Sequence, residues 1–161
     1  MKIRLFFGFI LSLIVVCMGM IMSNCSNKDE SIEDSLPIKL EQPEFFFVDT
    51  LNIVAVKQAC IYYDIKYPEI VVAQAILETG FFRSENCLKG NNLFGLYNSN
   101  TQKFYTFNHW TESVKAYKDK VQYRYKSGDY YTWLQDIGYA EDPMYISKVK
   151  HIEKKLNIMG L

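Results

Sequence analysis

Residues 68–80 read PEIVVAQAILETG, and this stretch carries the strongest structural signal in the chain. Pro68 suits the first turn of a helix, and Glu69 favours the positive end of the helix dipole. Gly80 is suited to end the helix, because it adopts the left-handed conformation without strain. Between these signals the residues are apolar almost all round, which predicts a helix buried in the core of a domain.

Glu78 is the exception within this apolar helix. Spacings of four, three and four residues place its carboxyl group on one stripe with Val71, Ala75 and Phe82. Apolar surroundings and the negative end of the helix dipole both disfavour the charged carboxylate, so we expect a raised pKa. A carboxyl group that stays protonated near neutral pH can protonate a glycosidic oxygen as a general acid. The alternative is a solvated glutamate, or one paired with the nearby Arg83.

The flanking patterns predict a mainly helical α+β domain with one small β element. A first helix is expected from a cap at Asp49 or Thr50 to about Tyr63. A β-hairpin is expected over Leu93–Phe107, with a turn-like polar cluster in its middle. Further helices are expected at about Thr111–Lys126, at Tyr130–Ile137, and from Pro143 through Leu156.

The N-terminus resembles an export signal. Lys2 and Arg4 precede an apolar run from Leu5 to Met22, which predicts either a cleaved signal over residues 1–24 or a retained anchor. Residues 22–25 resemble a bacterial lipobox, although Asn24 stands where Gly, Ala or Ser is usual. This resemblance favours cleavage and a lipid on Cys25. Residues 25–43 form the expected tether and residues 44–161 the domain. These features predict an exported lipoprotein of the outer membrane, on its periplasmic face or at the cell surface.

Composition narrows the classes of function. The 161 residues favour a single domain, and 18 basic against 18 acidic residues give no net charge, unlike a nucleic-acid-binding protein. Cys60 and Cys87 are compatible with a disulfide or with two buried thiols. No Cys/His cluster predicts a metal site, no cofactor is expected, and His109 and His151 are interpreted as structural.

Four short blocks, in order along the chain, resemble the bacterial β-N-acetylglucosaminidases that cleave peptidoglycan, the flagellar-muramidase-like family. They are residues 73–80, residues 92–96, residues 112–114 with Tyr117, and residues 138–145. The resemblance implies a lysozyme-like fold, in which a helical lobe and a small β-hairpin lobe flank a groove. It also implies that Glu78 is the catalytic acid and that Tyr139 lines the groove beside it. The substrate-binding residues expected around them are Asn92, Phe94, Gly95, Tyr97, Phe82 and Tyr145.

The sequence departs from this family at Phe81-Phe82, at Tyr97 and, above all, in its acidic residues. No Asp or Glu occurs between Leu88 and Trp110, where a second catalytic carboxylate would be expected in the β-lobe. Three routes remain open. The substrate's own acetamido oxygen attacks the sugar, which is the favoured route; Glu112 or Asp142 supplies the second carboxylate; or a transglycosylase-like reaction needs only one acid.

The expected partners are peptidoglycan strands and, through the lipid, a membrane; nucleic acid is not expected, and the protein is expected to be a monomer. Two further functions compete with hydrolysis of the cell wall. The missing β-lobe carboxylate is compatible with a non-catalytic wall-binding lipoprotein. Another polymer of N-acetylglucosamine, such as a host glycan, is an alternative substrate.

Overall fold

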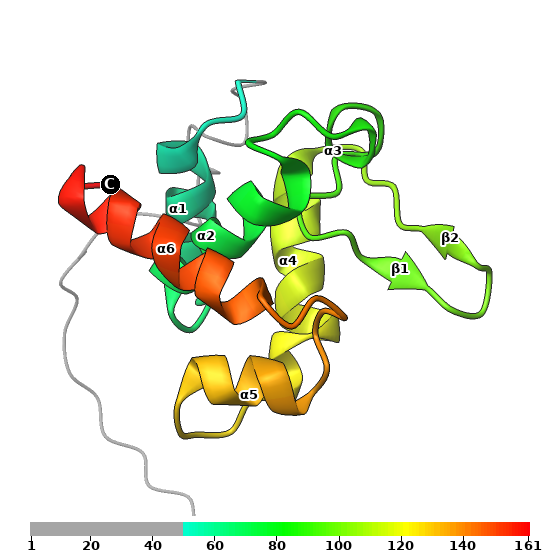
Figure 1. Ribbon diagram of the computed structural model, residues 1–161. Coiled ribbons are helices and arrows are strands. Elements are labelled where there is room, and N and C mark those ends of the chain that lie inside the picture. The colour runs from blue at the N-terminus through cyan, green and yellow to red at the C-terminus, as the bar shows by residue number, and fades with distance from the viewer. Residues whose placement is uncertain (1–49) are drawn as a thin grey trace, which may run out of the picture. The chain divides into compact units, whose positions relative to one another are not determined.

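The computed structural model describes residues 50–161, which form helices that surround a buried core and a small β-hairpin that extends from them (Figure 1). The expected signal sequence, Cys25, the tether and the cap at Asp49 lie outside these residues. The elements, in chain order, are α1 (Ile53–Tyr62), α2 (Pro68–Thr79), α3 (Glu85–Gly90), β1 (Tyr97–Asn98), β2 (Lys103–Phe104), α4 (Trp110–Lys120), the 3-10 helix η2 (Gln122–Arg124), α5 (Tyr130–Asp136) and α6 (Tyr145–Ile158). The predicted fold class, mainly helical with one small β element, is confirmed.

Helix α2 is the central element of the core. It begins at Pro68 and ends at Thr79, and Gly80 follows in the left-handed conformation, as predicted. Every residue from Ile70 to Ile76 is buried, and α2 packs chiefly against α6 and α1. Because each buried aliphatic side chain contributes about 1.5–3 kcal/mol, this helix is held firmly in place. Its C-terminal turn therefore presents Glu78 from a rigid support.

The β-hairpin is much shorter than predicted. Its strands are two residues each, paired antiparallel with Tyr97 opposite Phe104 and Asn98 opposite Lys103. The buried side chain of Asn92 forms hydrogen bonds with backbone groups at the base of the hairpin. Its Nδ2 donates to the carbonyls of Leu96 and Tyr105, both at 2.9 Å, and its Oδ1 accepts from the Leu96 N–H at 2.9 Å. The Asn92 amide thus replaces part of the backbone hydrogen bonding that was expected between the two strands.

Helix α4 ends at Lys120, six residues before the predicted end at Lys126. The cause is Gln122, whose buried side chain pairs with the backbone of Lys66. Its Oε1 accepts from the Lys66 N–H and its Nε2 donates to the Lys66 carbonyl, each at 2.8 Å. This contact draws the chain out of the α-helical path and into η2.

Other predicted boundaries also shift because side chains cap the helices. Asn52 caps α1, its Oδ1 accepting from the Ala55 N–H at 2.9 Å, rather than Asp49 or Thr50. Helix α6 begins at Tyr145, not at Pro143, since Asp142 first accepts a bond from the Met144 N–H. Helix α3 was not predicted, because it is short, polar and without an apolar period.

Two remaining features concern cysteines and membranes. Cys60 and Cys87 are both buried free thiols, which is the second of the two predicted alternatives. No helix within residues 50–161 is long and apolar enough to cross a membrane.

Candidate active site

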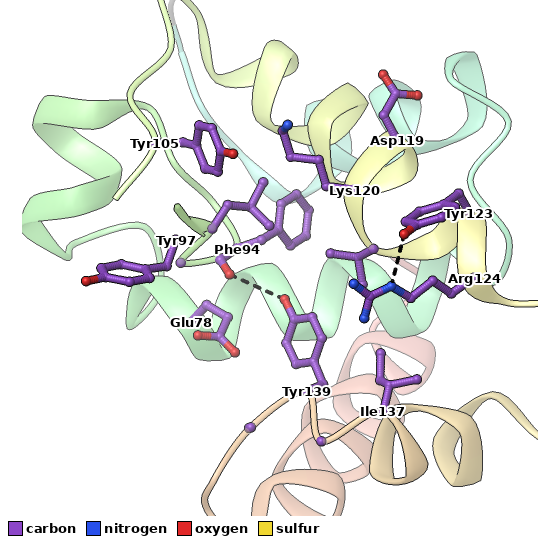
Figure 2. Close-up of a pocket in the computed structure, with 15 residues that line it drawn as sticks. Glu78, Phe94, Tyr97, Tyr105, Asp119, Lys120, Tyr123, Arg124, Ile137 and Tyr139 are labelled. Atoms are coloured by element: carbon purple, nitrogen blue, oxygen red, sulfur yellow. Dashed lines mark hydrogen bonds between the residues drawn. The ribbon is translucent and has the colours of Figure 1, made fainter. Parts of the chain in front are cut away.

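A cleft of about 720 Å³ opens at the C-terminal end of α2. One side is formed by the loop that leads into β1, with Phe94, Gly95 and Tyr97. The opposite side is formed by the end of α4 and by η2, and the 137–140 loop after α5 closes the base (Figure 2). Four segments that are distant in the sequence therefore meet around one hollow.

Glu78 projects into this cleft from the last turn of α2, with its carboxyl group towards the Tyr139 ring (Figure 2). Burial raises the pKa of this carboxyl above its usual value, and a hydrogen bond with the Tyr145 side chain offsets part of the rise. Within residues 50–161, Glu78 forms no salt bridge with Arg83 or with any other cation. Its surroundings therefore favour a protonated, proton-donating carboxyl group.

Gly95 brings the backbone of the β-lobe loop up to this carboxyl group. Its φ is +59°, and a Cβ atom at this position would lie 3.4 Å from Oε2 of Glu78. A larger residue would be strained in this left-handed conformation, and its Cβ would be in van der Waals contact with the acid. Glycine therefore keeps the space beside the carboxyl group open.

Tyr139 stands on the other side of Glu78. Its hydroxyl donates a hydrogen bond to the Phe94 carbonyl at 3.3 Å, which links the 137–140 loop to the β-lobe loop (Figure 2). Burial, followed by the neighbouring Glu78 carboxylate, raises the pKa of Tyr139 well above its usual value. The hydroxyl thus remains protonated and can act as a hydrogen-bond donor inside the cleft.

Behind Glu78, a chain of buried polar side chains crosses the core. Tyr145, on α6, hydrogen-bonds to Glu78 and accepts a bond from Gln74 Nε2 at 3.1 Å. Gln74 Oε1 in turn accepts from the hydroxyl of Tyr117 at 2.8 Å. Gln74 is fully buried, and both ends of its amide are paired. One face of α2 is thereby connected to α4 and α6 at the level of the acid.

The same series of hydrogen-bonded side chains continues to Gln122 in η2. The orientation of the Gln122 amide determines the direction of the hydrogen bonds that follow. Gln122 donates to the Tyr130 hydroxyl at 2.8 Å, and its amide orientation is set by its bonds to Lys66. Tyr117 already gives its proton to Gln74, so Tyr130 must donate across the 2.9 Å contact with Tyr117. In this arrangement Tyr117 and Tyr130 use their protons within this series. The Tyr145 proton is left for its other two partners, the Glu78 carboxyl and the Tyr139 hydroxyl.

Comparison with known proteins identifies the domain. Residues 54–158 match the family model of glucosaminidases, described as mannosyl-glycoprotein endo-β-N-acetylglucosaminidase. The chain belongs to the glucosaminidase family. Among curated proteins, none matches the chain. Among solved structures, the catalytic domain of the autolysin Auto from Listeria monocytogenes is similar at 23% identity and a TM-score of 0.48, over 74% of this chain and 88% of that one.

The predicted site residues of this glucosaminidase domain divide into two groups. Those that line the cleft are Glu78, Tyr139, Phe94, Gly95 and Tyr97. The others lie elsewhere: Asn92 is buried at the hairpin base, Tyr145 is buried behind Glu78, and Phe82 lies outside the cleft lining. Phe82 leaves the predicted helical stripe because Gly80, Phe81 and Phe82 are all left-handed, so the chain turns away after Thr79.

Neither candidate for a second carboxylate faces the glucosaminidase cleft. Glu112 is exposed in the first turn of α4 and accepts a bond from the Asn108 N–H at 3.2 Å. Asp142 forms a salt bridge with Lys148 at 2.6 Å. The second acidic residue that does line the cleft is Asp119, which pairs with Lys115 at 2.6 Å and lies far from Glu78 in Figure 2.

Sequence reasoning missed the residues on the α4 side of the cleft and the buried Gln74. Lys120 and Arg124 line the cleft together with Tyr105 and Tyr123. The four-residue spacing of the two cations was visible in the sequence, but it does not reveal which surface they face. The signal for Gln74 was its position as a polar residue in the middle of an apolar helix.

We expect Tyr145→Phe to shift the alkaline limb of the pH profile of kcat/KM to higher pH, by up to about one unit. This expectation rests on the general-acid role that the sequence predicts for Glu78. Such an acid acts in its protonated form, so activity would be lost as the pH rises through the pKa of that carboxyl. Tyr145 stabilises the carboxylate, and its removal therefore raises this pKa further.

Tyr131→Phe provides the matched control for this experiment. It also removes a hydroxyl that donates to a glutamate, Glu153, but outside the cleft. Its pH profile should coincide with that of the parent. An unchanged alkaline limb in Tyr145→Phe, or one at lower pH, would show that Tyr145 does not act on Glu78.

Proposed function

We propose that this domain is a peptidoglycan hydrolase, an endo-β-N-acetylglucosaminidase that cuts glycan strands with Glu78 as its general acid. The observation that carries the proposal is the position of Glu78 at the end of the core helix α2, inside a cleft and with a pKa raised by burial. Membership of the glucosaminidase family supports the proposed type of glycosidic bond. The resemblance of the four sequence blocks to enzymes of the cell wall supports peptidoglycan as the substrate.

The first step of the proposed reaction uses the substrate as its own nucleophile. Glu78 gives its proton to the glycosidic oxygen while the bond from that oxygen to the anomeric carbon breaks. The 2-acetamido oxygen of the same sugar forms a new bond to the anomeric carbon, which gives a cyclic oxazolinium intermediate. The Glu78 carboxylate then takes a proton from water, whose oxygen opens the ring and restores the acetamide.

Two features of the cleft support this route. Glu78 and Asp119 are the acidic residues that line the cleft within residues 50–161, and Asp119 is already paired with Lys115. Tyr139 provides a protonated hydroxyl beside Glu78, suited to orient the acetamido group. Its bond to the Phe94 carbonyl, at 3.3 Å, is long enough to be exchanged for one to the substrate.

Glu78→Gln should reduce kcat/KM on purified peptidoglycan by about 100-fold or more, because general acid catalysis contributes about 10²–10⁴-fold. The amide has the same shape and cannot give up a proton, so the thermal unfolding temperature should be retained. The assay is the release of new reducing ends carrying N-acetylglucosamine, identified by mass spectrometry.

Glu112→Gln and Asp142→Asn are the controls, since both residues lie outside the cleft, and both variants should keep the parental rate. Parental activity of Glu78→Gln would refute its role as acid. A parent protein that binds peptidoglycan but releases no ends would favour the non-catalytic alternative. Anhydro-sugar ends in place of reducing ends would identify a transglycosylase.

A thiazoline analogue of the cyclic intermediate should inhibit the enzyme competitively. We expect it to bind at least about 100-fold more tightly than N-acetylglucosamine, as is usual for mimics of high-energy states. Tyr139→Phe should weaken this inhibition, measured as the inhibition constant. An active enzyme that the thiazoline does not inhibit would point instead to an attacking carboxylate or water.

We also propose that the enzyme acts outside the cytoplasm, held to the outer membrane by a lipid on Cys25. The support is the basic and apolar N-terminal pattern followed by the lipobox-like residues 22–25. Cys25→Ser should abolish incorporation of labelled palmitate and move the protein from the membrane fraction to the soluble fraction. A labelled protein that stays in the membrane after this substitution would show that the anchor lies elsewhere.

A further inference from the structure

Two cations occupy the wall of the cleft across from Glu78. Lys120 is the last residue of α4, and Arg124 is the last residue of η2. Both line the same cleft as the acid, and Figure 2 shows them on the α4 side with Glu78 on the opposite side. No step of the proposed reaction uses either of them.

The positive charge of this pair is not neutralised by the protein. Within residues 50–161, neither Lys120 nor Arg124 forms a salt bridge. Asp119, the other acidic residue of the cleft lining besides Glu78, is already paired with Lys115 at 2.6 Å. Burial favours the neutral form of Glu78. The cleft therefore carries a net positive charge that lacks a partner in the described part of the chain.

Aromatic rings hold the two cations at the surface of the cleft. The Lys120 ammonium lies 4.7 Å from the centre of the Tyr105 ring. The Arg124 guanidinium carbon lies 5.6 Å from the centre of the Tyr123 ring, and Nε donates to the Tyr123 hydroxyl at 3.3 Å. These contacts restrict both side chains without removing their charge. Within residues 50–161 the terminal nitrogens of Arg124 form no salt bridge, and the hydrogen bond to Tyr123 uses Nε alone, so both remain available to a ligand.

We infer that Lys120 and Arg124 form a carboxylate-binding subsite for acidic substituents on the glycan strand. A planar guanidinium with free terminal nitrogens matches the two oxygens of a carboxylate, and an ammonium adds a second charged donor. The inference rests on the proposed function and adds the chemical class of its substrate. Peptidoglycan carries such acids on its stem peptides, and on its lactyl groups where the stem peptide has been removed, whereas chitin-like polymers are neutral.

The test uses one glycan in two charge states. Peptide-free peptidoglycan strands carry lactyl carboxylates, and coupling to methylamine converts them to neutral amides without altering the acetamido groups. We expect kcat/KM of the parent enzyme to be about two- to thirtyfold lower on the neutral strands, the range for two solvent-exposed ion pairs. In the double variant Lys120→Gln/Arg124→Gln, the ratio of kcat/KM on acidic strands to kcat/KM on neutral strands should approach one.

Salt provides a second readout on the same pair of substrates. Because the pair is exposed to solvent, its attraction for carboxylates is screened as ionic strength rises. The preference of the parent for acidic strands should therefore shrink between low salt and about 1 M salt, while the double variant shows little salt dependence in the ratio.

Lys89→Gln/Lys155→Gln is the matched control. It also removes two positive charges, but from exposed positions outside the cleft. The ratio of kcat/KM on acidic and neutral strands should therefore equal that of the parent. Equal cleavage of both strands by the parent, or a parental ratio in the Lys120/Arg124 variant, would overturn the subsite while leaving the hydrolase intact. A parent that cleaves neither substrate would overturn the proposed function itself.

Discussion

A carboxylic acid can donate a proton near neutral pH only if the protein shields it from water and still leaves it within reach of the substrate. In this domain helix α2 meets both requirements. Its middle turns are buried from Ile70 to Ile76, and its last turn emerges at the cleft with Glu78. The packing that stabilises the fold is therefore also the desolvation that raises the pKa of the acid.

The polar chain behind Glu78 shows how an acid can be buried without leaving unpaired groups. Gln74 is the key residue, because it accepts from Tyr117 and donates to Tyr145. A buried polar group that loses its partner costs about 1–3 kcal/mol, so each member of the chain constrains the next. Helices α2, α4, α5 and α6 are thus held in register by bonds that end at the Glu78 carboxyl. Core stability and the geometry of the acid rest on the same residues.

The features that follow local chemistry could be predicted from the sequence, while those that depend on distant contacts could not. Pro68 and Gly80 determine the ends of α2 through their own backbone preferences, so its boundaries were correct. The end of α4 depends on Gln122 meeting Lys66, 56 residues earlier, and the length of the hairpin depends on the buried Asn92. No periodicity in the sequence encodes such bonds.

The same distinction applies to the candidate site. Glu78 was conspicuous as a carboxyl group on an apolar stripe, and Gly95 was expected at the site from the family resemblance. The structure places both at the cleft. Their roles with substrate stay predictions. Phe82 was misplaced because the left-handed run that begins at Gly80 turns the chain away. Tyr145 carries no sequence sign that it lies behind the acid rather than beside the sugar.

The two walls of the cleft have opposite electrostatic requirements. A cation close to Glu78 would stabilise its carboxylate, lower its pKa and remove the proton that the proposed reaction uses. An acidic glycan, however, needs positive charge somewhere along its path. The structure separates the two: burial and Tyr145 set the pKa of Glu78, while Lys120 and Arg124 stand on the opposite wall against Tyr105 and Tyr123. Ring contacts are suited to this task, because they hold a cation in place without supplying the negative charge that would cancel its attraction for the substrate.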